Sequence, residues 1–141
     1  MTDDEQPVIN TEEQSDADEV SVNRIDEQIR TLAESAAEDR EAFESPATPP
    51  DEQRATELLR EGFGPAVWVY VEGHTGGRNR QFGRAELALL ERAMNDWLEL
   101  YARCYGVELD ARFSVREAAK LLVETRNVRE TAQLLTRVPD R

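Results

Sequence analysis

The sequence has few of the residues on which most catalytic and metal centres depend. Its 141 residues include one histidine, His74, and one cysteine, Cys104. A single cysteine excludes an intramolecular disulfide, and one residue of each type excludes a zinc site built from several cysteines and histidines. A nucleophilic Cys104–His74 pair would have to join a helix to a distant loop, so Cys104 is expected in the core.

Long apolar runs and targeting signals are also missing. No run approaches the ~18 apolar residues of a membrane span. The acidic opening MTDDEQP is the opposite of the basic start of a signal peptide. These observations predict a cytoplasmic protein that does not bind membranes.

Lysine is nearly absent, since Lys120 is the only one and the other bases are arginines. The acids are unevenly spread: the first 50 residues carry 15 Asp and Glu against three Arg, whereas the remaining 91 carry 15 acids and 14 bases. Residues 1–20 have too few apolar groups to offset chain entropy, which predicts a disordered acidic tail. Residues 51–141 are predicted to form one compact α+β domain.

An amphipathic helix is predicted over residues 21–44, between the tail and the domain. Apolar residues recur there at three- and four-residue steps, interrupted by Asp39. Such a helix is either marginal, docking on its own domain or fraying in solution, or it pairs with a partner or a second copy. The segment SPATPP, residues 45–50, predicts a stiff proline-rich hinge. A further helix is predicted over residues 49–61, ended by Gly62.

A β-hairpin is predicted after that helix. Residues 65–72 form a short run rich in β-branched and aromatic side chains, which favours a strand. Glycine-rich residues 73–77 predict a turn, and residues 78–82 are long enough to return as a second strand. Trp68 and Tyr70 would share one strand face, which a monomer rarely leaves bare. They are the predicted interface with a protein partner or a second copy of the chain.

The rest of the sequence predicts helices. Leu87 to Cys104 carry apolar residues in alternating steps of three and four, typical of a long core helix over residues 84–105 that Gly106 ends. SVREAAKLL (114–122) and NVRETAQLL (127–135) form a repeat, and each copy opens with a capping residue three positions before a glutamate. The predicted class is therefore α+β and mainly helical: a long core helix and a C-terminal helix pair packed with one hairpin.

The terminal helix pair resembles the helix-turn-helix of DNA-binding regulators, with the hairpin arginines as a phosphate-contacting wing. The connection lacks the usual glycine, and simple helix packing is the competing interpretation. The candidate contacts to nucleic acid or to an acidic partner are Arg78, Arg80, Arg84, Arg126, Arg129 and Arg137. The acidic N-terminal segment could compete for these arginines as an internal mimic of an acidic partner.

No catalytic site is predicted. Carboxylates are plentiful, but only Asp96, between Asn95 and Trp97, sits beside apolar residues that could raise a pKa, and a surface acid or a structural hydrogen bond is the alternative. No cofactor, metal or small-molecule substrate is indicated. The sequence therefore predicts a non-enzymatic protein-interaction or adaptor domain, with a DNA-binding transcriptional regulator as the alternative.

Two runs carry a family resemblance: GPAVWVYVEGHTGG (64–77) and ERAMNDWLELYARCYGV (91–107). They resemble small proteins of haloarchaeal genomes that form a family without assigned function. The resemblance covers roughly residues 51–139. It implies a halophilic setting, in agreement with the acidic, lysine-poor composition, for which a mesophilic acidic regulator is the alternative. It implies no catalytic or binding residues.

Overall fold

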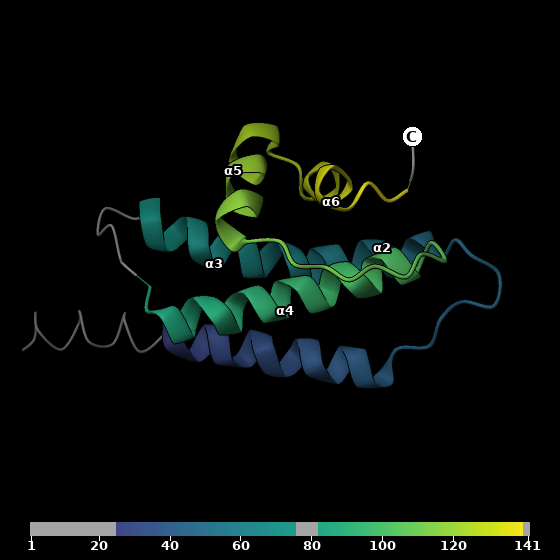
Figure 1. Cartoon of the computed structure of the whole chain (residues 1–141), viewed down its shortest axis with the longest axis horizontal. Coiled ribbons are helices and arrows are strands. Elements are labelled where there is room, and N and C mark those ends of the chain that lie inside the picture. The colour runs from purple at the N-terminus through teal and green to yellow at the C-terminus, as the bar shows by residue number, and fades with distance from the viewer. Residues whose placement is uncertain (1–24, 76–81, 140–141) are drawn as a thin grey trace, which may run out of the picture.

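The computed structural model describes residues 25–75 and 82–139, and every regular element within these ranges is helical. Three long helical stretches lie side by side, with α4 (Arg84–Arg103) packed against the other two, and two short helices cover one side (Figure 1). The predicted α+β class and its β-hairpin are therefore wrong for the described residues. The predicted disordered tail, residues 1–20, lies outside them.

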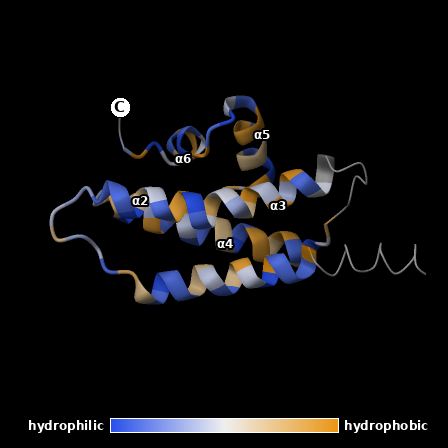
Figure 2. Cartoon of the chain, turned by 180° about the vertical axis from the view of Figure 1, so that it is seen from behind, coloured by the Kyte–Doolittle hydropathy of each residue, from blue (hydrophilic) through white to orange (hydrophobic). Residues whose placement is uncertain are grey.

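The amphipathic helix is confirmed over residues 25–42, and residue 25 is the first residue that the structure describes. Ile29 and Ala36 of its apolar stripe are buried in the core, and hydrophilic residues cover much of its remaining surface (Figure 2). Asp39, which interrupts the stripe, accepts a hydrogen bond of 2.9 Å from the indole N–H of Trp97. Because a buried N–H needs a partner, this acid holds the helix on the domain. Of the alternatives for this helix, docking is observed.

The following helix starts later than predicted, at Glu52. The carboxylate of Asp51 caps it by accepting a 3.1 Å hydrogen bond from the backbone N–H of Arg54. The backbone N–H of Asp51 donates to the carbonyl of Cys104 at 2.8 Å. The cap is therefore tied to the end of α4, and this contact fixes where the helix begins.

This helix does not end at Gly62. It runs without a break through three consecutive elements, α2 (Glu52–Leu58), the π-helical turn η1 (Leu59–Phe63) and α3 (Gly64–Thr75). The Gly64 N–H donates to the carbonyl of Leu59, five residues back. Pro65 follows, which has no N–H and whose ring would collide with the carbonyl four residues earlier in a regular α-helix. The wider turn relieves that collision, so the helix continues past the proline.

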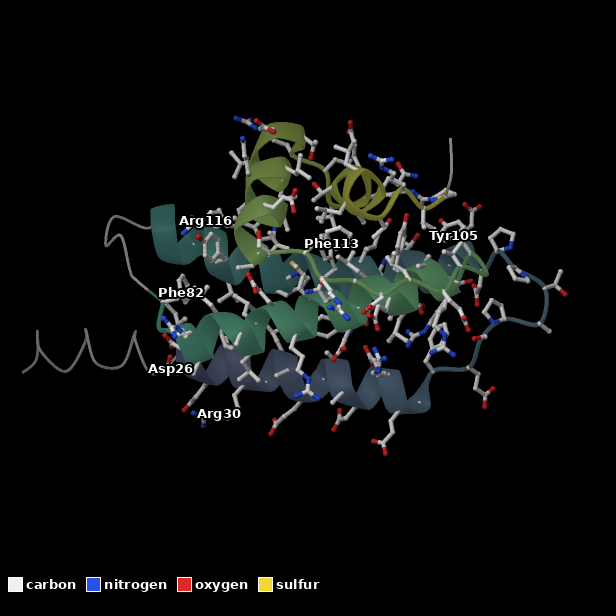
Figure 3. All side chains as sticks on the ribbon, in the orientation of Figure 1. Asp26, Arg30, Phe82, Tyr105, Phe113 and Arg116 are labelled. Atoms are coloured by element: carbon white, nitrogen blue, oxygen red, sulfur yellow. The ribbon has the colours of Figure 1, made fainter. Side chains whose placement is uncertain are left out.

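The predicted strand, residues 65–72, lies in α3. Except for the exposed Glu72, its side chains are apolar all round the helix, and α3 packs against α4 on one side and α5 on another. A short apolar run does not distinguish a buried strand from a buried helix, and tertiary packing here overrides the β preference of its residues. Residues 78–81 of the second predicted strand lie outside the described residues. Phe82 stacks on Tyr70 near the end of α3, with ring centroids 5.4 Å apart (Figure 3).

The core helix is confirmed as α4, whose inner face is buried at Leu90, Met94, Trp97 and Tyr101. Gly106 follows it with a φ of 79°, as expected of a residue that terminates a helix. A Cβ atom at Gly62 of η1 would lie 2.4 Å from Cε2 of Trp97. Gly62 therefore permits the close approach of η1 and α4 and is not a helix cap.

The C-terminal helix pair is also confirmed, as α5 (Val115–Thr125) and α6 (Val128–Thr136). Ser114 and Asn127 cap them by accepting hydrogen bonds of 3.1 and 2.8 Å from the backbone N–H three residues later. In place of the expected glycine, Arg126 takes the left-handed conformation after α5, with φ 55°. The sequence repeat is therefore a repeat of two capped helices.

Candidate functional site

Trp68 is the main exposed apolar side chain of α3. It is 47% exposed, whereas its neighbours Val67 and Val69 are buried. Grooves open on both sides of it, and Pro65 and Trp68 line both of them. Trp68, Pro65 and the two grooves are called the Trp68 surface below. An exposed tryptophan between two apolar-lined hollows is typical of a binding surface.

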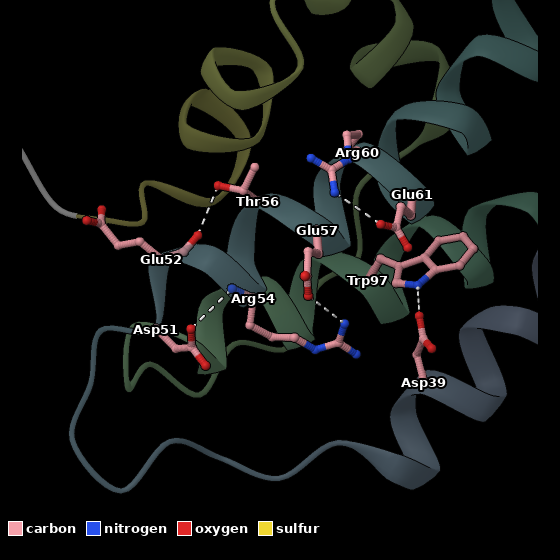
Figure 4. A network of polar contacts seen from close by, with 9 residues as sticks. All are labelled: Asp39, Asp51, Glu52, Arg54, Thr56, Glu57, Arg60, Glu61 and Trp97. Atoms are coloured by element: carbon pink, nitrogen blue, oxygen red, sulfur yellow. Dashed lines mark hydrogen bonds and ion pairs between the residues drawn. The ribbon is translucent and has the colours of Figure 1, made fainter.

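The first groove has a volume of about 310 Å³ and lies between α3 and α6. Its walls are mainly apolar, with Leu59 and Val128 on opposite sides, and its two charged residues are Arg60 and Arg129. Arg60 pairs with Glu61 at 3.2 Å, but both side chains are largely exposed, so the pair is weak (Figure 4). This groove is called the basic groove.

The second groove has a volume of about 490 Å³ and lies between α3 and the helix over residues 25–42. Leu32 and Val69 contribute apolar wall, and its two charged residues are Glu27 and Glu72. Neither glutamate forms an ion pair within the described residues. This groove is called the acidic groove. The Trp68 surface is therefore apolar at its centre, positive on one side and negative on the other.

Arg129 is held in place from three directions. Its guanidinium donates to the Tyr105 hydroxyl at 3.0 Å, to a carboxylate oxygen of Glu52 at 3.3 Å and to the Thr56 hydroxyl at 3.5 Å. Burial raises the pKa of Tyr105, and the charge of Arg129 opposes that rise. These contacts fasten α6 to α2 and keep Arg129 beside the basic groove.

The sequence placed Trp68 and Tyr70 on one face, and this is wrong because the segment is a helix. Residues two positions apart point in directions ~200° apart on a helix. Tyr70 is buried against Phe82, and the guanidinium of Arg116 hydrogen-bonds to its hydroxyl. Of the two predicted interface residues, the structure leaves only Trp68 available to a partner.

The predicted arginine contacts do not form one patch in the described part of the chain. Arg84 is exposed at the first turn of α4, while Arg126 and Arg137 stand at opposite ends of α6, and only Arg129 lies at a groove. Arg78 and Arg80 lie outside the described residues. Sequence reasoning missed Arg60, whose position beside Pro65 and Val128 depends on the unpredicted continuation of the helix.

A model of one protein family, described as a domain of unknown function (DUF8055), matches residues 23–140. The chain belongs to this family. The match includes the docked helix over residues 25–42 as well as the C-terminal pair. No curated protein and no solved structure matches the chain.

Asp96, the acid of this DUF8055 domain that stood out in the sequence, has a structural partner. Burial raises the pKa of Asp96, and Arg40, 3.2 Å from its carboxylate, opposes the rise. Arg40 also pairs with Glu99 at 2.6 Å, and Glu99 accepts a hydrogen bond from the backbone N–H of Ala111. Asp96 thus belongs to the contacts that hold the helix over residues 25–42. This agrees with the alternative given for Asp96 above, a structural hydrogen bond.

Cys104 is buried in the core, as expected, and the structure does not bring it together with His74. Cys104 follows α4 at the end far from α3's last turn, which contains His74, and α4 is ~30 Å long. Burial raises the pKa of the Cys104 thiol to about 11. Within residues 25–75 and 82–139, no group of three or more His, Cys, Asp or Glu could hold a metal ion. In the same part of the chain, no helix is both long and apolar enough to cross a membrane.

Proposed function

We propose that this domain is a non-catalytic protein-interaction module that pairs with a second copy of itself through the Trp68 surface. The observation that carries the proposal is the exposed Trp68 between a basic and an acidic groove. Tryptophan is among the residues most often found at the energetic centre of an interface. Covering its exposed half contributes about 2 kcal/mol per copy, at ~25 cal/mol for each Å² of apolar surface.

The charges favour a second copy as the partner. In a two-fold symmetric pair each copy contributes the same surface, turned about the axis. With the axis passing Trp68 at right angles to the line from Arg60 to Glu72, the basic groove of one copy faces the acidic groove of the other. Arg60 then lies opposite the partner's Glu72, and this happens twice. Such complementarity selects the partner and its orientation more than it adds affinity.

Light scattering over a concentration series tests the pairing. We expect the wild-type chain to reach the mass of a dimer, and Trp68→Glu to stay monomeric because two buried carboxylates would meet at the axis. Leu134→Glu is the matched control, since Leu134 on α6 is 52% exposed and lines neither groove. A wild-type chain that stays monomeric at every concentration, or equal losses in the two variants, would overturn the proposal.

The experiment belongs in a salt series that extends to molar concentrations. The composition, with 30 acids and one lysine, supports a halophilic setting for the protein. At 1 M salt the Debye length is ~3 Å, so the charge contribution to pairing falls while the contact of Trp68 remains. Dimers that persist in molar salt with reduced affinity are the expected result.

DNA binding by the terminal helices stays a prediction that no contact in the structure favours. In a helix-turn-helix, the second helix would present Arg129 to the major groove of DNA. Here Arg129 is bound to Glu52 and Tyr105. Val128 of the same helix lines the basic groove against α3. Titration with duplex DNA at low salt addresses this alternative, and binding that weakens with added salt would support it.

A further inference from the structure

A third groove lies on another side of α3, between α3 and α5, with a volume of about 530 Å³. Tyr70 and Val71 line it from α3, and Ala119 and Val123 line it from α5, so its lining is mainly apolar. Val123 is 54% exposed, more than any other large apolar residue among those described. This α3–α5 groove shares no residue with the Trp68 surface.

Two cations border the α3–α5 groove. Arg116 and Lys120 are exposed and one helical turn apart on α5. Arg116 is held over the groove by its hydrogen bond to the Tyr70 hydroxyl. Lys120 forms no ion pair within the described residues, although Glu124 lines the far end of the groove. An apolar floor beside two cations fits a segment that combines apolar residues with carboxylates.

The N-terminal segment of the chain has this composition. Residues 1–20 contain eight acids and no base. Val8 and Ile9 form an apolar pair between two acidic clusters, residues 3–5 and 12–13. The family match begins only at residue 23, so this segment is an addition to the domain.

The segment also enters the structure at a suitable place. The first described helix begins at the end of the bundle where Phe82 and Arg116 lie, next to Asp26 in the same view (Figure 3). Ile25 follows Ile9 by sixteen residue steps. Such a length spans up to ~50 Å when extended, more than the ~30 Å length of α4.

From these observations we propose that the α3–α5 groove is a docking site for acidic segments with an apolar centre, and that residues 1–20 of the same chain occupy it. Val8 and Ile9 cover Val71, Ala119 and Val123, and the flanking carboxylates face Arg116 and Lys120. An acidic partner that uses this groove must first displace the segment. The groove and its occupant are independent of pairing through Trp68.

Paramagnetic relaxation measured by NMR on the full chain tests the docking. A spin label on Ser15→Cys reacts selectively, because Cys104 is fully buried and burial raises the pKa of its thiol to about 11. We expect strong loss of signal at Ala119 and Val123, and little at Val107 and Leu134 on other surfaces. Equal loss at all four residues would overturn the proposal.

Charge reversal identifies the groove. Arg116→Glu combined with Lys120→Glu is expected to abolish the selective loss at Val123. The matched control is Arg30→Glu combined with Arg92→Glu, which makes the same change in charge at two exposed residues elsewhere. Selective loss that survives the first pair, or that disappears equally in both, would contradict docking in this groove.

A mixed sample identifies the source of the segment. Spin-labelled chains are mixed with isotope-labelled chains that carry no spin label, and signal loss is read on the latter. No loss at Val123 is expected, whereas loss there would mean that the segment of a second copy fills the groove, against the proposal. Repeating the measurement in Trp68→Glu separates this result from pairing, since the proposal expects the same pattern in a monomer.

Discussion

The two tryptophans of the chain both lie in long helices but in opposite environments. Trp97 of α4 is 1% exposed and donates its indole N–H to Asp39, whereas Trp68 of α3 is 47% exposed and has no role in the core. Trp97 connects the helix over residues 25–42, η1 and α4. The core therefore depends on Trp97, whereas Trp68 stands half-exposed at the surface.

The difference arises from how the two helices are covered. α4 has polar residues on its outer side, so its apolar stripe marks the core directly. α3 is apolar on most sides because other helices flank it, and of its two exposed positions among the described side chains, Trp68 and Glu72, one also carries an apolar side chain. In a buried helix, an exposed tryptophan is thus better evidence for a partner than it would be on an ordinary surface helix.

The largest expected effect is the difference in unfolding free energy between variants of the two tryptophans. Trp97→Ala is expected to lower the free energy of unfolding by about 3–5 kcal/mol, because it opens a cavity and removes the partner of Asp39. Trp68→Ala is expected to change it by less than about 0.5 kcal/mol, since surface substitutions have small effects. Urea denaturation of dilute, monomeric samples measures both. Similar losses in the two variants would mean that Trp68 belongs to the core.

A smaller effect tests the close contact between η1 and Trp97. Gly62→Ala would place a Cβ 2.4 Å from the ring of Trp97, which has no free space into which to move. We expect a loss of about 2–3 kcal/mol despite the better helix propensity of alanine. Gly83→Ala is the control, because a Cβ there meets only the Glu86 carboxylate, at 3.5 Å. A stabilised Gly62→Ala variant would show that η1 and α4 do not approach so closely.

The smallest effect concerns the hydrogen bond that the Trp97 indole N–H donates to Asp39, for which Trp68 has no counterpart among the described residues. Asp39→Ala leaves the Trp97 indole N–H without its partner and is expected to cost about 1–2 kcal/mol. Glu38→Ala, one position earlier and exposed, is expected to cost almost nothing. Thermal unfolding of both variants checks this. If the two lose equal stability, the helix over residues 25–42 is held by its apolar stripe alone.

The helices that carry a one-sided pattern could be predicted from the sequence. The stripes of the helix over residues 25–42 and of α4, and the caps Ser114 and Asn127, all correspond to observed features. α3 could not be predicted in this way, because burial on several sides removes the helical period and leaves a run that local preference assigns to a strand. Gly62 and Pro65 reinforced the error, since each usually ends a helix and here lies within or beside a π-helical turn.

The candidate site was predicted only in part, for the same reason. Trp68 was predicted as an interface residue because a large exposed aromatic side chain favours a partner, whether it stands on a strand or on a helix. Tyr70 was added because a strand would place it beside Trp68, and the helix turns it into the core. Arg60 and Glu72 could not be connected to Trp68, since their places on either side of it depend on packing against α6 and against the helix over residues 25–42.

A charge exchange across the Trp68 surface tests self-pairing most directly. Arg60→Glu alone and Glu72→Arg alone each bring like charges together twice in the symmetric pair, so each is expected to weaken dimerisation measured by sedimentation equilibrium. The double variant exchanges the two charges and is expected to recover the wild-type dissociation constant. A double variant as weak as either single variant, or single variants that dimerise like the wild type, would contradict pairing of two copies through this surface.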